Sequence, residues 1–168
     1  MSRPRLPALL SVVLAAVSVG CVSAGTPGPS PFPNAPRAFV RSTDTETAAA
    51  LIATALQFRG VPYRLGGDEP LRGFDCSGFV HYVFEQHRVA LPRTVAEQYE
   101  VGAKVSLSHL EPGDLVFFAT TASNATHVGL AVGPDEFIHA PGTGGVIRID
   151  RVDAPYWKAR ALGARRVY

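Results

Sequence analysis

The first half of the domain carries apolar residues at helical spacing. Thr43 and Glu46 have the spacing of a capping box, which predicts an alanine-rich helix from there to Phe58. A second helix is predicted over residues 75–88, because four large apolar residues recur on one of its faces: Phe79, Val80, Val83 and Phe84. A short third helix is expected over residues 94–99.

The second half changes to short apolar runs separated by Gly, Pro, Asp and Asn, a pattern typical of strands joined by turns. The runs expected to form strands are Leu115–Ala119, His127–Val132, Glu136–Ala140, Val146–Ile149 and a final one near Ala161–Tyr168. Helices followed by strands predict an α+β domain, in which the helix of residues 75–88 packs on an antiparallel sheet.

The first residues predict export. Residues 1–20 have the layout of a secretory signal peptide: two arginines, an apolar run over residues 9–19, then small residues before Cys21. The run is shorter than the roughly 20 residues of a membrane-spanning helix, and a retained anchor is the alternative. Ser18-Val19-Gly20-Cys21 resembles a bacterial lipoprotein cleavage site, with serine where leucine is usual. Cys21 is therefore a candidate for lipidation, and a protein free in the periplasm is the alternative. If a lipid is attached, Val22 in place of aspartate, by resemblance to enterobacterial sorting, favours the outer membrane.

Composition divides the rest of the chain in two. Residues 21–38 are rich in proline, which predicts an extended tether, and residues 39–168 have the size of one domain with a single core. The 168 residues include 16 Lys and Arg against 14 Asp and Glu, and removal of the two signal-peptide arginines leaves a formally neutral chain. A nucleic-acid partner is not expected, since it requires a concentrated basic face.

The chain has two cysteines, Cys21 and Cys76. If Cys21 carries a lipid, Cys76 is an unpaired thiol in an exported protein, which indicates reactivity. Asp75 is a favourable N-cap residue, so Cys76 is expected in the first turn of its helix, where the helix dipole lowers the pKa of a thiol. The small side chains of Ser77 and Gly78 leave room for a substrate beside the sulfur. The alternative is a buried, inert cysteine.

A nucleophilic cysteine needs a base that is itself oriented by a third group. His127 opens one predicted strand and His139 closes the next, and a short antiparallel connection places these two ends side by side. Two alternatives remain open: each histidine has only a structural role, or Cys76 and both histidines bind zinc, with Asp75 or Glu136 as the fourth ligand. Because no Cys-x-x-Cys pair accompanies them, no metal or cofactor is expected.

Six blocks of the sequence, in one order, resemble the NlpC-type family of cell-wall cysteine peptidases. The blocks are Pro62–Gly67, Phe74–Val80, Leu91–Thr94 with Gln98, Pro112–Phe118, His127–Leu130 and Phe137–Ala140. The resemblance implies a papain-like α+β fold with N-terminal helices packed on a C-terminal antiparallel sheet. It also implies an endopeptidase that cuts peptidoglycan stem or cross-bridge peptides through a thioester, at a γ-D-glutamyl–diamino acid bond or a D,D cross-link.

Carried over by matching motif, the resemblance implies Cys76 as the nucleophile, His127 as the general base and His139 as the residue that orients it. Tyr63 looks like the side chain near the oxyanion. Asp75, and Ser77 with it, look like contacts for the amine end of the substrate. The expected partners of a monomeric protein are peptidoglycan peptides, with membrane contact only through the lipid.

Two other functions remain open from the sequence. One is an acyl or peptidyl transferase on the same scaffold, and the other is a non-catalytic wall-binding lipoprotein.

Overall fold

The computed structural model describes residues 42–168, with side chains from Asp44 onward. The predicted signal peptide, the tether and Cys21 lie outside these residues. The helices are α1 (Ser42–Leu56), α2 (Cys76–Gln86), α3 (Val95–Glu100), the 3₁₀ turn η1 (Leu107–His109) and α4 (Pro155–Lys158). The strands are β1 (Asp68–Glu69), β2 (Gly73–Phe74), β3 (Ala103–Val105), β4 (Leu115–Phe118), β5 (His127–Ala131), β6 (Glu136–His139), β7 (Arg148–Arg151) and β8 (Ala161–Arg166).

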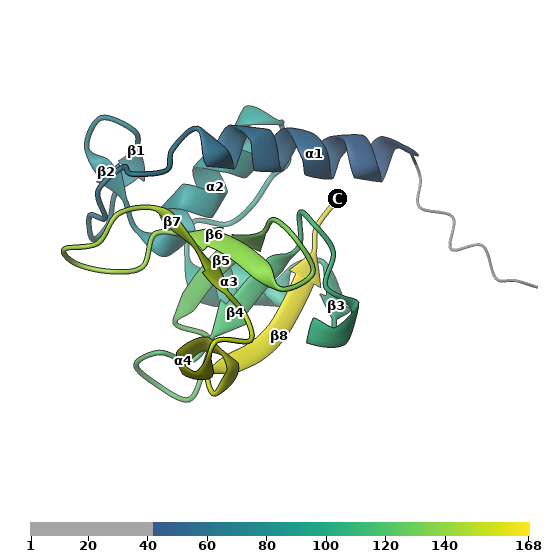
Figure 1. The fold of residues 1–168 in the computed structure, drawn as a ribbon. Helices are drawn as coiled ribbons and strands as arrows, with labels where there is room; N and C mark the ends of the chain where they lie inside the picture. Colours follow the sequence, from purple (N-terminus) through teal and green to yellow (C-terminus); the bar gives the residue numbers. More distant parts are fainter. Residues whose placement is uncertain (1–41) are drawn as a thin grey trace, which may run out of the picture. The chain divides into compact units, whose positions relative to one another are not determined.

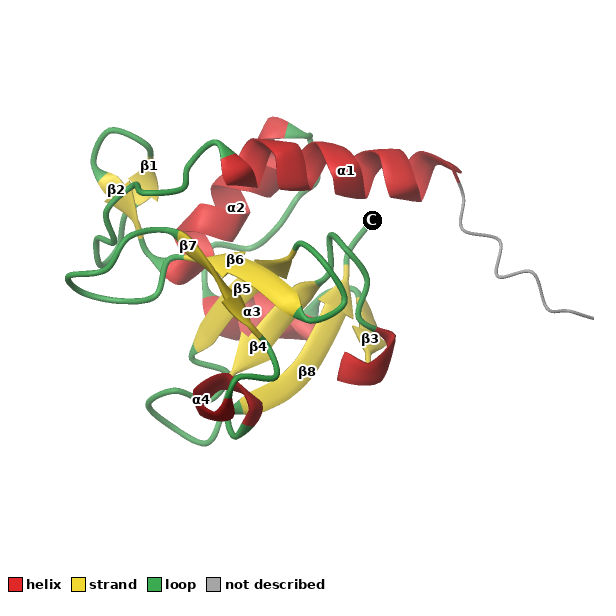
Figure 2. Ribbon diagram, viewed as in Figure 1, coloured by secondary structure: helices red, strands yellow, loops and turns green. Residues whose placement is uncertain are grey.

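Six strands form one antiparallel sheet in the order β3-β8-β4-β5-β6-β7, and β1 and β2 pair separately. Figure 1 shows α1 and α2 together above this sheet, with α4 at its lower end. The same view coloured by secondary structure separates a helical layer from a strand layer (Figure 2). The predicted α+β, papain-like class, with helices packed on a C-terminal antiparallel sheet, is confirmed.

The central strand β4 shows how both faces of the sheet are covered. Leu115 and Phe117 pack into a large core with α1 and α2, and Val116 and Phe118 pack into a smaller core with Trp157 of α4. All four side chains are fully buried, because successive residues of a strand point to opposite faces. Sequence runs that are apolar at every position, such as this one, therefore mark the central strands.

Some element boundaries differ from the sequence prediction. The first helix already includes Ser42, so Thr43 is a helical residue and not the predicted cap. The strand expected at Val146–Ile149 lies at Arg148–Arg151, because the residues before it pair elsewhere: Pro62 bridges Val146, and Ile147 donates to the Val61 carbonyl. The short β1, β2, β3 and α4 were not predicted. By contrast, α2 begins directly after its predicted cap Asp75, and α3 lies where a short helix was expected, capped by Thr94.

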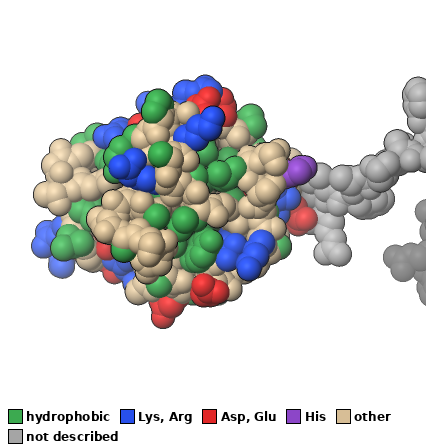
Figure 3. All heavy atoms as spheres, turned by 90° about the horizontal axis from the view of Figure 1, so that it is seen from below, with side chains coloured by type: hydrophobic (Ala, Val, Ile, Leu, Met, Phe, Trp, Pro, Cys, Tyr) green, Lys and Arg blue, Asp and Glu red, His purple; other side chains and the backbone are tan. Residues whose placement is uncertain are grey.

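The surface of residues 42–168 is mixed in charge. On the face shown in Figure 3, basic and acidic side chains are interspersed with apolar ones and do not gather by sign. No helix in this part of the chain is long and apolar enough to cross a membrane.

Asp114, which is fully buried, ties the turn before β4 to the end of the neighbouring strand β8. Its carboxylate accepts from Arg166 Nε at 2.8 Å and Nη2 at 2.9 Å, and from the backbone N–H of Glu111 at 2.9 Å. We expect Asp114→Ala to lower the free energy of unfolding by about 1.5–3 kcal/mol, since hydrogen bonds to a charged group are lost. Urea denaturation measures this. Arg151→Ala, which removes an exposed ion pair with Asp153, is the control and should change stability little. If Asp114→Ala and Arg151→Ala lowered the free energy of unfolding equally, the stabilising role of Asp114 would be contradicted.

Candidate active site

Cys76 is the first residue of α2. The helix is capped by Asp75, whose Oδ1 accepts from the backbone N–H of Gly78 at 2.7 Å. Cys76 is 9% exposed and is the free cysteine of the described residues. Its sulfur lies against β5, because the backbone N–H of Val128 hydrogen-bonds to it. Since Val128 directly follows His127, the start of α2 and the start of β5 meet at the thiol.

The pKa of the Cys76 thiol is raised above its ordinary value. Burial is the largest cause, and the negative charge of Asp75 adds to it. The backbone N–H groups of Val128, Ser77 and Cys76 act in the opposite direction, but they do not outweigh the loss of solvent. The lowered pKa expected from the helix position is therefore wrong for the protein without substrate. A protonated thiol needs a base to remove its proton.

The two predicted histidines lie together. His127 opens β5 and His139 ends β6, and their Nε2 and Nδ1 atoms are 2.8 Å apart. Both side chains are buried, with 4% and 0% exposed. The prediction that the two strand ends bring these residues side by side is confirmed.

Both histidines are held neutral. Burial is the main cause that lowers the pKa of His127 to about 3, with repulsion from His139 second. Burial likewise lowers the pKa of His139 to about 4, although the charge of Asp150 and its hydrogen bond act in the opposite direction. A neutral imidazole has one nitrogen with a free lone pair, so His127 stays unprotonated near neutral pH and has a nitrogen available as an acceptor during a reaction.

Two residues that the sequence analysis did not single out complete this cluster. Trp157 stacks on the His127 ring with 5.3 Å between centroids, and its Nε1 donates to Asp150 Oδ2 at 3.0 Å. Asp150 Oδ2 also accepts from His139 Nε2 at 3.0 Å. The signal that pointed to them was weak: Trp157 is the one tryptophan of the chain, and Asp150 is one of 14 acidic residues.

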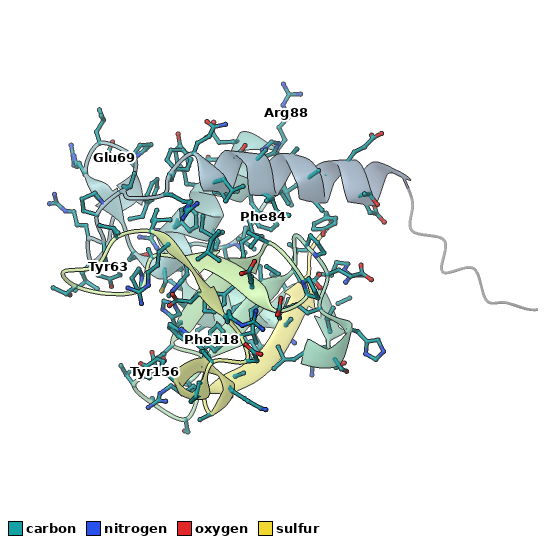
Figure 4. The ribbon with its side chains drawn as sticks, in the orientation of Figure 1. Tyr63, Glu69, Phe84, Arg88, Phe118 and Tyr156 are labelled. Atoms are coloured by element: carbon teal, nitrogen blue, oxygen red, sulfur yellow. The ribbon has the colours of Figure 1, made fainter. Side chains whose placement is uncertain are left out.

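Tyr63, labelled in Figure 4, is close enough to Cys76 and Asp75 for their charges to act on its hydroxyl. Burial raises the pKa of its phenol first, and negative charge at Cys76 and Asp75 raises it further. Its hydroxyl thus keeps its proton and can donate a hydrogen bond. The backbone fixes its position, since Tyr63 donates its N–H to Gly145 and bridges Phe74 of β2.

Asp75 is occupied by partners within the chain. Oδ1 accepts from Ser77 Oγ at 3.2 Å and from Arg93 Nη1 at 2.9 Å, and Oδ2 accepts from Arg93 Nη2 at 2.8 Å and from the Gly66 N–H at 3.0 Å. Arg93 also donates to Ser77 Oγ and to the carbonyl of Gly67. The structure thus gives Asp75 and Ser77 a role in building the loop around the nucleophile. Their contact with a substrate amine stays a prediction.

The close approach at this loop explains one glycine. A Cβ at position 78 would lie 2.1 Å from the Gly67 carbonyl oxygen and 2.9 Å from Arg93 Nη2. Only glycine therefore lets α2 start this close to the loop. Among residues 44–168, no group of three or more His, Cys, Asp or Glu side chains is placed to hold a metal ion.

Comparison with known proteins places this geometry in a family. The model of the NlpC/P60 family matches residues 60–166, which is well over half of the chain. The chain belongs to the NlpC/P60 family. The matched range contains Tyr63, Cys76, His127 and His139, and it spans α2 and the six-stranded sheet.

Relatives in this family are similar over most of the domain. The murein DD-endopeptidase MepS/murein LD-carboxypeptidase of Escherichia coli K12 is 44% identical over 129 residues, which are 76% of this chain and 66% of that protein. The gamma-DL-glutamyl hydrolase of Bacillus subtilis is 34% identical over 78% of this chain and 32% of its own length. The chain thus spans two thirds or less of these NlpC/P60 relatives.

Solved structures of the family agree with the fold. The crystal structure of an NlpC/P60 family protein from Bacillus cereus superposes with a TM-score of 0.68 at 35% identity, over 71% of this chain and 40% of that one.

The two buried histidines predict a loss of stability in acid. Their folded pKa values lie near 3 and 4, below the 6.5 of an exposed histidine, so the unfolded chain binds protons first. Their contribution is full above pH 6.5 and is lost as the pH falls towards 4, at up to about 1.4 kcal/mol per pH unit for each proton. Urea denaturation between pH 7 and pH 5, a window chosen above the carboxylate range, measures this slope.

The control for the acid-stability prediction is a pair of variants. His127→Gln removes one buried histidine and should flatten the slope. His109→Gln replaces an exposed histidine outside the cluster and should leave the slope as in the wild type. A wild type with no slope above pH 5 would contradict the neutral, buried pair.

The raised pKa of Cys76 predicts slow alkylation at neutral pH. The rate with iodoacetamide should rise with pH through a midpoint above 9.0, the ordinary thiol value. Mass spectrometry of the alkylated protein follows the rate, and Cys76→Ser corrects for other sites. A midpoint below 7 would show instead a preformed thiolate–imidazolium pair.

Proposed function

We propose that this protein is a cysteine endopeptidase that hydrolyses peptide bonds of peptidoglycan through a thioester. One observation supports this most: the thiol of Cys76 lies at a helix start against the first residues of β5, where His127 is hydrogen-bonded to His139 at 2.8 Å. The start of α2 and the adjoining ends of β5 and β6 thus supply what we propose as a nucleophile, a base and a residue that orients the base.

The first step starts from a neutral Cys76 thiol and a neutral His127 imidazole. As the sulfur of Cys76 attacks the carbonyl carbon, the thiol proton passes to the free nitrogen of His127. The new S–C bond and the negative carbonyl oxygen form together with an imidazolium. His127 then gives this proton to the leaving nitrogen, and the C–N bond breaks to leave a thioester.

The second step releases the enzyme. Water attacks the thioester carbonyl while His127 takes one of its protons. The C–S bond breaks, the acid product leaves, and the proton returns to the sulfur of Cys76. His139 holds the His127 ring in place through both steps.

The negative oxygen needs donors at the position where its charge develops. We propose the backbone N–H of Cys76, at the start of α2, as one donor, and the Tyr63 hydroxyl, whose raised pKa keeps it protonated, as the second. Loss of one such donor typically slows an enzyme by about 10²–10³-fold. This is the role we propose for Tyr63.

The substrate class rests on the relatives. Proteins similar to this chain are named as a murein DD-endopeptidase and as a gamma-D-glutamyl-L-lysine dipeptidyl-peptidase, so we propose the D,D cross-link and the γ-D-glutamyl–diamino acid bond as the two candidate bonds. The Asp75 carboxylate already accepts five hydrogen bonds within the chain. Because these internal bonds occupy the carboxylate, we propose that the substrate is held by contacts along its peptide backbone more than by an ion pair between its free amine and Asp75. The Ser77 hydroxyl is likewise occupied, by Asp75 and Arg93.

Location and assembly follow from the proposed substrate. A wall hydrolase acts outside the cytoplasm, which fits the signal peptide proposed at residues 1–20. A lipid on Cys21 would hold the domain at a membrane through the residues 21–38 tether, in the periplasm or at the outer membrane. We propose that the protein acts as a monomer.

Digestion of purified muropeptides tests the proposal. We expect the wild-type protein to cleave one defined bond, and Cys76→Ala to lose more than about 10⁴-fold of the rate. His109→Ala, an exposed substitution, is the control and should retain activity. Mass spectrometry of the products identifies which of the two bonds is cut.

Other outcomes would change the assignment. Products joined to an added amine would identify a transferase that uses the same thioester. Muropeptides bound but not cut by the wild type would identify a non-catalytic wall-binding protein. Cleavage by Cys76→Ala at the wild-type rate would contradict the nucleophile.

A further inference from the structure

Asp150 is the fourth residue of a series of polar side chains that begins with Cys76 and continues through His127 and His139. It lies on β7, which pairs with β6 so that His139 faces Arg148, two residues before Asp150. Because residues two apart in a strand point to the same face, the carboxylate reaches the ring of His139. Its Oδ2 accepts from His139 Nε2 and from Trp157 Nε1, both at 3.0 Å.

These contacts determine which ring nitrogen carries the proton in His139 and in His127. An ionised carboxylate only accepts, so His139 must carry its proton on Nε2. Neutral His139 then has a lone pair on Nδ1, which can only accept from His127 Nε2. Neutral His127 therefore carries its proton on Nε2, and its Nδ1 is left with a free lone pair.

We propose that Asp150 is a positioning residue that fixes the tautomers of His139 and His127, and thereby leaves His127 Nδ1 free to take the Cys76 proton. This inference rests on the proposed function. In it, Asp150 touches no substrate and acts on the reaction only through the rings of His139 and His127. Without the carboxylate, His139 can carry its proton on Nδ1. It would then donate to His127 Nε2 and move the His127 proton onto Nδ1, where it blocks the base.

The charge of Asp150 gives it a second effect on the reaction. When His127 takes the thiol proton, an imidazolium forms in a buried place, and the titratable groups that act on it are His139, which is neutral, Asp150 and Arg148. Asp150 is the one anion among these three. Its charge raises the pKa of both histidines against the larger effect of burial, and Arg148 partly offsets it.

Tautomer and charge can be separated with two substitutions. Asp150 Oδ2 accepts from His139, from Trp157 and from both Nε and Nη2 of Arg148, so an asparagine at this position keeps its oxygen on that side. Asp150→Asn therefore retains the acceptor for His139 but loses the charge. Asp150→Ala loses both.

The first measurement is the rate of muropeptide cleavage by the full chain. We expect Asp150→Ala to lower kcat by about 10–100-fold with KM unchanged, the usual effect of removing an outer partner of an active-site histidine. Asp150→Asn should lose less. The matched control is Arg151→Ala, which removes exposed ion pairs with Asp135 and Asp153 from the next residue of β7 and should keep wild-type kcat.

The second measurement is independent of the substrate. Nitrogen-15 NMR of the histidine rings reports which nitrogen carries the proton. We expect Nε2 protonated and Nδ1 bare on both rings of the wild type and of Asp150→Asn, and protonation on Nδ1 to emerge in Asp150→Ala. If the wild type cleaves no muropeptide, the proposed function fails, whereas the tautomers still test Asp150.

Two results would overturn the role of Asp150. One is an Asp150→Ala protein whose ring protons remain as in the wild type. The other is a loss of kcat in Asp150→Ala no larger than in Arg151→Ala. Thermal unfolding of the three variants shows whether any loss of rate reflects a loss of fold.

Discussion

The bidentate pair between Arg93 and Asp75 holds together the segments that build the site. Arg93 comes from the loop before α3, and its guanidinium binds the cap of α2 and the carbonyl of Gly67. Both charged groups are only partly exposed, with 32% of the Arg93 and 13% of the Asp75 side chain accessible. Their lost hydration must therefore be offset by well-aligned hydrogen bonds, which the two parallel N–H···O contacts provide. Because Asp75 fixes where α2 begins, it also fixes where Cys76 lies against β5. The hydrogen bond from the Val128 N–H to the sulfur therefore depends on this cap.

Burial then decides the protonation of the site. The first residues of α2 and β5 exclude water, and this raises the pKa of the Cys76 thiol and lowers the pKa of both histidines. Each effect favours the uncharged form. The resting site is therefore a neutral thiol and two neutral imidazoles. In the proposed mechanism, charge appears only as a substrate carbonyl is attacked. The negative oxygen would then meet the donors at the helix start and at Tyr63, and the positive His127 ring would be reached by the charge of Asp150 through His139.

How far the sequence predicted this site depended on how local each signal was. The cap at Asp75 acts within three residues and was predicted correctly, whereas the capping box at Thr94 was not singled out, although its helix was expected. His127 and His139 mark the ends of neighbouring strands, so a short connection sufficed to place them together. Asp150 and Trp157 depended on the register of β6 with β7 and on the return of the chain through α4, which no local pattern encodes. The direction of the Cys76 pKa shift was missed for the same reason, since burial results from tertiary packing.

The protonated, recessed thiol has a consequence for the chemical lifetime of the protein. Peroxides and disulfides react with the thiolate, and a thiol that is 9% exposed and mostly protonated is a poor target for them. Residues 42–168 contain no second cysteine that could condense with an oxidised Cys76. A nucleophile stored in this form resists oxidation in the absence of substrate, so the fold that excludes water from the site also preserves its sulfur between turnovers.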